Sequence, residues 1–527
     1  MKQEDMFPCL LFVFSRKRVE IISKQISTSL FLENEKDYNV EPIFRQLLVS
    51  KLENWKEYKQ MQEYDFYVGL LEKGIGIHHA GMLPIYRELM EILYEKKYIK
   101  VLVCTETFAI GLNMPTRSVI FSSLYKHDGK SIRMLHSHEF TQMAGRAGRR
   151  NIDTKGNIVL LSNLYECPKN SDYYNLFHSS PKVLKSRYTT NYSLLLNYIN
   201  KYDETKFVDM VKKSLMNTDI DTQRSLCVNN MRELESQIKE TEKQMSEHSY
   251  NIVEFFHIIE EKEFSLKHMK NKQQKRAKKD HQIYLDTNRD KLNDKHIYDH
   301  YILLKQKLKK EQQYHEYCLN YVQYQVQAIF NILQNNEFLD KTSGIISEKG
   351  IMASVYHELP CLIFTDTYKR VERFITITDV ELACYLSCFY PIKVPESEKI
   401  HNPIYVVNYI ETTIGFINKY IDEELKHELY ISTGCVLQYD IMEPIKKWMN
   451  GVSTNEECAY FFEELKQLYN ISVGDFVKCC LKIVNMTNEI IVMCDIDENY
   501  ILKETCLSVQ QKIQKNIVTN RSLYLAL

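Results

Sequence analysis

Residues 142–150 read Gln-Met-Ala-Gly-Arg-Ala-Gly-Arg-Arg, and this stretch decides how the chain is interpreted. We predict a helix over residues 138–149. Side chains spaced i, i+4 and i+7 share one face of a helix, so this helix would present Gln142, Arg146 and Arg149 together. Two arginines on one face form a fork for phosphate oxygens. The pattern is typical of groups that neutralise charge developing on the γ-phosphate of a nucleotide.

Two glycines lie beside these arginines. Gly145 and Gly148 remove side chains where a phosphate or a neighbouring domain would have to approach closely. Glycine inside a helix costs up to about 1 kcal/mol, so two within one turn need a reason. The close approach supplies that reason.

A second informative stretch lies upstream, where residues 105–115 read Thr-Glu-Thr-Phe-Ala-Ile-Gly-Leu-Asn-Met-Pro. It follows a predicted strand at residues 101–104. Hydroxyl groups and free backbone N–H groups at a strand end can bind the phosphate backbone of a nucleic acid without reading bases. Gly111 and Asn113 are residues that supply a turn.

The first 165 residues alternate short apolar runs with helical periods, which predicts a doubly wound parallel sheet. The predicted strands are residues 10–15, 76–79, 101–104, 118–122 and 157–161. A helix is predicted over residues 84–97, with proline in its first turn.

Polar residues follow the first two predicted strands, at the edge where such sheets bind ligands. Ser15 and Arg16 stand at the end of the first strand, where a simple salt bridge is the alternative, and His79 and Gly81 stand at the end of the second. We expect contacts to a nucleic-acid backbone there. A metal site at the paired histidines is not predicted, because no cysteine or carboxylate has matching spacing.

No phosphate-binding loop of the form GxxxxGK[ST] occurs in these 527 residues. Two pairs of glycines have the right spacing, but Ile75-Gly76 and Met82-Leu83 follow them instead of Lys and Ser/Thr. Residues 422–425, Asp-Glu-Glu-Leu, come nearest to a DExH box, but they lie in a polar stretch predicted to be helical and have no histidine.

The composition indicates a folded protein of several domains with a net charge of −1, so any nucleic-acid site must be a local patch. The 14 cysteines show no zinc spacing, and Cys384 and Cys388 are interpreted as reduced core thiols. We expect an intracellular protein, cytoplasmic or nuclear, with no signal peptide and no membrane span.

The middle of the chain has a different composition. No glycine occurs between Gly156 and Gly344, which predicts long helices and a helical hairpin over residues 228–335. Its arms of roughly 40 residues would each extend about 60 Å. A basic run at residues 267–279 is either a solvated tip or a contact for RNA or protein. Residues 340–375 suit a small mixed module, and the remainder looks helical.

Residues 7–165 resemble the second RecA-like domain of the superkiller-like, exosome-associated DExH RNA helicases. Besides residues 105–115 and 142–150, residues 74–82 and the string Ser-Ser-Leu-Tyr-Lys-His-Asp-Gly at 122–129 carry the resemblance. Asn151 stands where the family usually has Gly.

The resemblance continues downstream and implies further domains. Residues 181–187 and 347–353 are similar to parts of the family's winged-helix region, and Gly474-Asp475-Phe476-Val477-Lys478 is similar to the start of a DSHCT signature helix. The hairpin falls where the family inserts its arch, here without a predicted β-barrel head. The implied domains are 1–168, a second RecA-like domain; 169–227 with 340–375, a winged-helix-like region; 228–339, an arch-like insertion; and 376–527, a DSHCT-like helical domain.

By this resemblance, individual residues receive roles. Catalytic roles fall to Arg146 and Arg149. ATP-binding or coupling roles fall to Gln142, Gly145, Gly111 and Asn113. RNA-binding roles fall to Ser15, Arg16, His79, Gly81, Thr105, Glu106, Thr107 and Lys478. No residue is assigned to a metal.

The resemblance implies one portion of an ATP-dependent RNA helicase that acts on single-stranded RNA. ATP and its Mg²⁺ would be held by a first RecA-like domain, on another chain or on a missing N-terminal segment. An RNA-decay nuclease complex is an expected partner. The alternatives are a non-catalytic RNA-binding or docking module with the same fold, and a fragment of a longer gene product.

Overall fold

The structure is a computed structural model. It describes residues 6–31, 35, 39–109, 116–129, 131–149, 151–161, 168–179, 184–186, 188–201, 204–268 and 270–518. The chain divides into two compact units, one of Met1–Val183 with Ser347–Leu527 and one of Leu184–Ile346. The first unit contains a parallel sheet, and most of the remaining described chain is helical, as expected for an α/β fold joined to α-helical regions.

The parallel sheet has five strands in the order β2-β3-β1-β4-β7. These are β1 (Cys9–Phe12), β2 (Ile75–His78), β3 (Val101–Cys104), β4 (Ser118–Phe121) and β7 (Asn157–Leu160). All five predicted strands are confirmed, most with slightly different ends. Leu10 pairs with Leu102 on one side and with Val119 on the other, so β1 lies at the centre. Because all pairs are parallel, the carboxyl ends of the strands share one edge.

Helices and one hairpin connect these strands, and one further helix, α7, follows the last of them. The helices are α1 (Arg16–Gln25), α2 (Val40–Lys51), α3 (Trp55–Lys59), α4 (Gln62–Leu71), α5 (Pro84–Glu95), the short 3₁₀ helix η2 (Glu106–Ala109), α6 (Ser137–Ala144) and α7 (Asn170–His178). An antiparallel hairpin of β5 (Tyr125–His127) and β6 (Ile132–Met134), which was not predicted, lies between β4 and α6.

The predicted helix over residues 138–149 is wrong in its second half. Helix α6 ends at Ala144, and residues 145–149 form a turn. Gly148 has a φ of +91°, which glycine adopts without strain but which ends a helix. Arg146 and Arg149 therefore do not share a helical face with Gln142.

The rest of the first unit is helical. It contains α14 (Glu348–Ser354), α15 (Cys361–Arg370), η4 (Glu372–Phe374), α16 (Asp379–Ser387), η5 (Glu396–Glu398), α17 (Val407–Leu425), η6 (Ser432–Gly434), α18 (Met442–Gly451), α19 (Asn455–Leu468), α20 (Val473–Ile496) and α21 (Tyr500–Ile513). Trp448 is fully buried against Phe461, Phe462 and Phe476, which joins α18, α19 and α20.

The expectation of a mixed module at residues 340–375 is corrected by the structure. The described residues there form α14, α15 and η4, with only an isolated bridge between Leu339 and Ile346. Several of the Gly, Thr and β-branched residues that suggested a mixed module lie in helices instead. Thr365 and Thr367, for example, lie buried inside α15 and donate to carbonyls one turn back.

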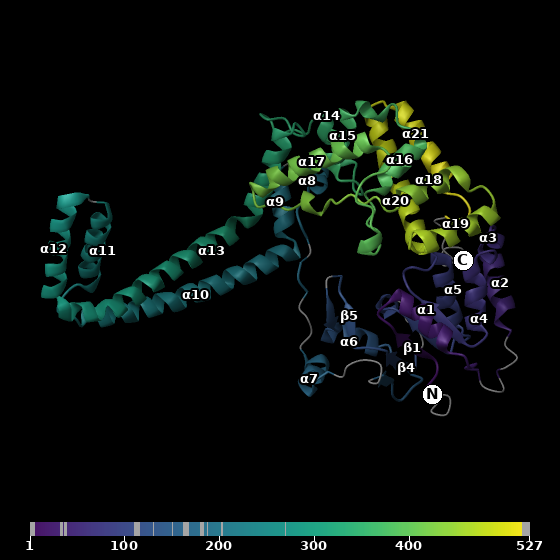
Figure 1. Cartoon of the computed structure of the whole chain (residues 1–527), viewed down its shortest axis with the longest axis horizontal. Helices are drawn as coiled ribbons and strands as arrows, with labels where there is room; N and C mark the ends of the chain where they lie inside the picture. The colour runs from purple at the N-terminus through teal and green to yellow at the C-terminus, as the bar shows by residue number, and fades with distance from the viewer. Residues whose placement is uncertain are drawn as a thin grey trace. The chain divides into compact units, whose positions relative to one another are not determined.

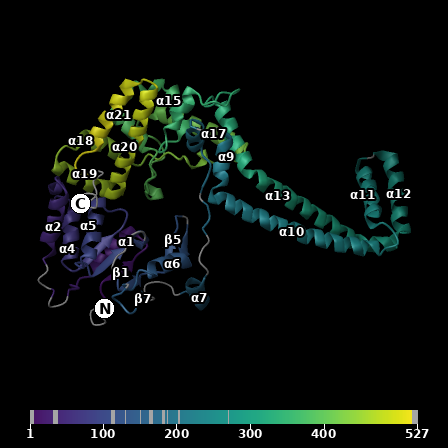
Figure 2. The ribbon, with the colours of Figure 1, turned by 180° about the vertical axis from the view of Figure 1, so that it is seen from behind.

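The second unit contains the predicted pair of long helices, but the first arm begins at Leu215 and not at residue 228, and two further helices lie between the arms. It contains α8 (Tyr192–Ile199), α9 (Glu204–Lys212), α10 (Leu215–Ser246), α11 (Ile252–His268), α12 (Asn271–Thr287), η3 (Arg289–Asp294) and α13 (Lys295–Asn335). Helices α10 and α13 run side by side, and α11 and α12 form a second pair at their far end (Figure 1; Figure 2).

A small core lies where α11 meets the far ends of α10 and α13, and in it Phe256 of α11 stacks on Tyr298 of α13 at 5.1 Å between ring centroids. The predicted basic run covers the end of α11 and most of α12. Lys275, Arg276 and Lys278 are exposed there. The solvated tip and the contact for RNA or protein both stay predictions.

Candidate functional site

The carboxyl edge of the sheet carries most of the predicted RNA-binding residues. Ser15 caps α1 by accepting a hydrogen bond from the backbone N–H of Arg18 at 3.4 Å. Thr105 follows β3, donates its backbone N–H to the carbonyl of His78 at 3.1 Å, and shares a hydroxyl hydrogen bond of 2.9 Å with Thr107. These hydroxyls therefore lie at the ends of neighbouring strands, as predicted.

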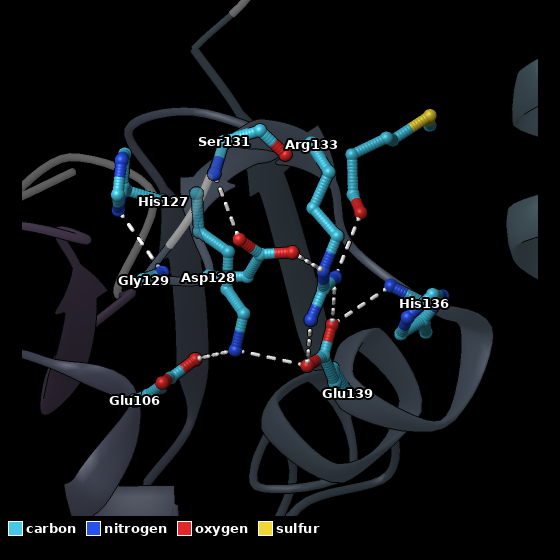
Figure 3. Close-up of polar contacts among 10 residues, drawn as sticks. Glu106, His127, Asp128, Gly129, Ser131, Arg133, His136 and Glu139 are labelled. Carbon is cyan, nitrogen blue, oxygen red and sulfur yellow. Dashed lines mark hydrogen bonds and ion pairs between the residues drawn. The ribbon is translucent and has the colours of Figure 1, made fainter.

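A cluster of four charged residues, which we call the Lys126 cluster, ties this edge to α6 (Figure 3). The cluster consists of Glu106, Lys126, Arg133 and Glu139. The Lys126 Nζ lies 2.5 Å from Glu106 Oε2 and 2.9 Å from Glu139 Oε1. The Lys126 side chain is only 12% exposed and that of Glu139 is 17% exposed, so this ion pair is shielded from water, whereas Glu106 is 43% exposed. Lys126 therefore joins η2, β5 and α6.

Glu139 is the centre of this cluster. It accepts two hydrogen bonds of 2.9 Å from the Arg133 guanidinium and one of 2.8 Å from the His136 backbone N–H. Burial alone would raise the pKa of Glu139, but the hydrogen bonds from Arg133, Lys126 and His136 outweigh burial and hold this pKa well below its ordinary value. The glutamate is therefore ionised at neutral pH and fixes the amino end of α6.

The hairpin that carries Lys126 is held in the same way. Asp128 accepts from the Ser131 backbone N–H at 3.0 Å and lies 3.5 Å from Arg133 Nε, and His127 accepts from the Gly129 backbone N–H at 3.0 Å (Figure 3). Between α1 and this hairpin lies a hollow of about 680 Å³, lined among others by Ser15, Ile21 and Tyr125.

The arginines lie in a turn at the other end of α6, residues 145–149, which we call the arginine turn. Arg146 donates to the carbonyl of Ala109, the last residue of η2. Gly148 donates its backbone N–H to the carbonyl of Thr116 at 3.0 Å. A Cβ on Gly148 would lie 3.2 Å from the backbone of Gly156, and a Cβ on Gly156 would lie 2.5 Å from the backbone of Ala147, so two segments of this chain approach closely at Gly148.

Arg149 is held by Asp153. Its Nε and Nη2 donate to the two carboxylate oxygens of Asp153 at 2.7 Å each, and its backbone N–H donates to the same carboxylate at 2.9 Å. The hydrogen bond from the Arg149 side chain lowers the pKa of Asp153 to about 2. Asn151 has a φ of +63°, a conformation that asparagine tolerates, so it can replace the family's glycine here.

The amino end of α20 docks on the loop after β2, where other predicted RNA-binding residues gather. Arg16 Nη1 lies 2.5 Å from Asp475 Oδ2, and Lys478 Nζ donates to the carbonyl of Ala80 at 2.6 Å. Burial lowers the pKa of Lys478, although Asp475 favours its charged form. Arg16 and Lys478 therefore join two parts of the first unit.

Backbone contact reinforces this docking. Gly474 donates its N–H to the carbonyl of Gly81 at 3.1 Å, and a Cβ on Gly474 would lie 2.4 Å from the carbonyl oxygen of Met82. His79 is buried, with its Nδ1 accepting from Gly81 at 3.2 Å and its Nε2 3.5 Å from Glu20. His79 and Gly81 therefore shape the loop.

The remaining predicted residues are placed as follows. Gln142 and Gly145 are exposed on and just after the last turn of α6. Gly111 and Asn113 lie outside the described residues. Within the described part of the chain, no group of three or more His, Cys, Asp or Glu residues could hold a metal ion. Among the same residues, no helix is long and apolar enough to cross a bilayer.

Comparisons with known proteins bear on this geometry. The DSHCT (NUC185) domain model matches residues 370–520. The antiviral helicase SKI2 of Saccharomyces cerevisiae is 38% identical over 215 residues, which make up 41% of this chain and 16% of that protein. The exosome RNA helicase MTR4 of Homo sapiens is 36% identical over 207 residues, 39% of this chain and 19% of that protein. The chain is a relative of the superkiller-like DExH helicases.

These matches confirm the predicted resemblance to the superkiller-like helicases, including its DSHCT domain. A further relative, the DExH-box ATP-dependent RNA helicase DExH11 of Arabidopsis thaliana, is 46% identical over 145 residues, 28% of this chain. The chain matches less than a fifth of the length of SKI2 and of MTR4, at 16% and 19%.

Several residues of this site were not predicted. Lys126 and Asp475 pair with residues on other elements, Glu106 and Glu139 for Lys126 and Arg16 for Asp475, which spacing does not reveal. Arg133 and Glu139 are only six residues apart, but they are joined across the end of a hairpin that was not predicted. Asp153 could have been found, because an acid four residues after Arg149 is a common ion-pair spacing.

Proposed function

We propose that this chain is a portion of an ATP-dependent RNA helicase of the exosome-associated type. It supplies arginine fingers to ATP and contacts to the backbone of single-stranded RNA. The phosphate loop, the DExH box and the Mg²⁺ ligands come from a first RecA-like domain, on another chain or on a segment outside these 527 residues.

The observation that carries this proposal is the Lys126 cluster. The hydroxyls proposed to hold RNA lie beside η2, and the arginines proposed to hold ATP follow α6. Lys126 joins these two elements through ion pairs of 2.5 and 2.9 Å, and Arg146 joins them again at Ala109. A motor needs its polymer site and its nucleotide site in mechanical contact, whereas a simple RNA-binding surface does not.

The residues present fit one side of a nucleotide site. Arg146 and Arg149 offer planar donors to phosphate oxygens, and neither needs a metal for this role. ATP, when presented by the other domain, supplies the phosphoryl bond that is hydrolysed. Arg149 would exchange the Asp153 carboxylate for a phosphate group, because each of these groups can accept two hydrogen bonds from a guanidinium.

One observation favours the alternative of a non-catalytic RNA-binding or docking module. Both arginines already have internal partners, namely the Ala109 carbonyl and the Asp153 carboxylate. In that case the arginine turn would be a structural element, and RNA binding would not respond to nucleotide or to a partner domain.

The test is to purify the endogenous protein from its native source and to identify what accompanies it by mass spectrometry. The proposal expects a companion, or peptides of a longer form of this chain, that contain GxxxxGK[ST] and a DExH box. RNA binding without either of them, and unchanged by added ATP, would favour the non-catalytic module and contradict the proposal.

A further inference from the structure

We infer that Lys126 is a positioning residue that couples the RNA-contacting turn η2 to α6, the helix that leads into the arginine turn. This inference rests on the proposed function, because it assumes that RNA binds beside Thr105 and Thr107.

The geometry places one ammonium group between two elements that are far apart in sequence. Glu106 is the first residue of η2, and Glu139 lies in the first turn of α6. Lys126 Nζ contacts both carboxylates, at 2.5 and 2.9 Å, while only 12% of its side chain is exposed. A shielded charge that loses its partner is costly, so the three groups tend to move as one.

The α6 side of this link is rigid. Arg133 and the His136 backbone N–H together hold Glu139 with three hydrogen bonds of 2.8 to 2.9 Å. Glu106, by contrast, is 43% exposed, and Lys126 is its ion-pair partner in the cluster. A displacement of η2 would therefore move Lys126, and Lys126 would in turn displace the amino end of α6, where Glu139 is held in place.

Lys126 has a second consequence for RNA. Glu106 places a negative charge beside the hydroxyls that are proposed to contact phosphate. Lys126 neutralises this charge, and its removal would leave a carboxylate that repels the RNA backbone. Loss of Lys126 should therefore lower RNA affinity and interrupt coupling, and these two effects can be separated.

The experiment is hydrogen–deuterium exchange on the full chain, with and without a 12-residue oligouridine at saturating concentration. In the wild type, RNA should slow exchange in residues 105–109 and also in α6, residues 137–144. In Lys126→Met, we expect RNA affinity to fall several-fold. At saturation, protection of residues 105–109 should remain, and protection of α6 should fall by more than half.

Two variants separate position from charge. Lys126→Arg should restore protection of α6, because it keeps a cation that can reach both carboxylates. The double variant Lys126→Met with Glu106→Gln should regain affinity, since the repelling charge is gone, but not the protection of α6. Lys100→Met is the matched control, since Lys100 forms a shielded ion pair of 2.7 Å with Glu35 and is 15% exposed.

Wild-type protection of α6 in a folded Lys126→Met, or in Lys126→Gln should the methionine variant not fold, would overturn the inference and leave the proposed function standing. Absence of RNA protection at residues 105–109 in the wild type would overturn the proposed function, and the inference with it.

Discussion

At the scale of single residues, the contact between Arg149 and Asp153 matters most for the proposed function. It holds the proposed finger in place through two side-chain hydrogen bonds of 2.7 Å. The same contact means that the finger must change partner to reach a phosphate. Asp153 is therefore both a support for the arginine turn and a competitor of the nucleotide.

Asp153→Asn should reduce the free energy of unfolding at pH 7 by about 1 to 3 kcal/mol, since hydrogen bonds to charged groups are worth about this much. The pKa of Asp153 is lowered from 3.8 to about 2, so its contribution is fully present above about pH 4. The contribution is lost as the pH falls from 4 to 2. Urea unfolding at several pH values would measure the difference between wild type and variant.

The difference between wild type and Asp153→Asn should shrink as the pH falls below 4, because the wild-type carboxyl becomes protonated. Asp422→Asn, at an exposed position of α17, serves as the control and should show little difference at any pH. A gap for Asp153→Asn that widens in acid would contradict this assignment.

At the scale of elements, the amino end of α20 packs closely against the loop after β2. The signature 474–478 was visible in the sequence, but its docking on the loop after β2 was not. Gly474 allows that docking, because any side chain there would meet the Met82 carbonyl oxygen at 2.4 Å.

Gly474→Ala should destabilise the first unit by about 1 to 3 kcal/mol, as overpacking does when backbone must move. Gly415→Ala in α17 is the matched control, because its Cβ would meet nothing within 4 Å. This control should be neutral or stabilising, by up to about 1 kcal/mol from helix propensity. Chemical denaturation of both variants measures this, and equal stability of the two would show that the packing at Gly474 is not needed.

At the scale of the whole molecule, local patterns were the easiest to predict. Strands β1 to β4 and helix α5 follow from buried apolar runs and from proline at a helix start. The helical hairpin follows from the absence of glycine. These features depend on nearest neighbours in sequence, which is why spacing reveals them.

What spacing could not predict depends on contacts between distant segments. The extended helix over residues 138–149 failed because Gly148 takes a left-handed conformation and donates to Thr116. The Lys126 cluster was missed because Glu106 and Glu139 lie on other elements. The β5–β6 hairpin was missed although its strands pair locally, over residues 125–134. Arg16 and Lys478 were predicted as RNA contacts, and the structure adds that both also join α20 to the sheet domain.

The chain as a whole has a net charge of −1, so binding to RNA must come from its local groups and not from a general field. We propose that the RNA contacts at the sheet edge and the arginine turn act together on a nucleotide held by another domain.

The most direct test is RNA-stimulated ATP hydrolysis after mixing this chain with the domain that carries the phosphate loop and DExH box. We expect hydrolysis that neither part shows alone. Arg149→Ala should lower turnover by about a thousandfold or more, as for other arginine fingers, while RNA affinity stays unchanged. Wild-type turnover by Arg149→Ala would show that Arg149 does not act on ATP.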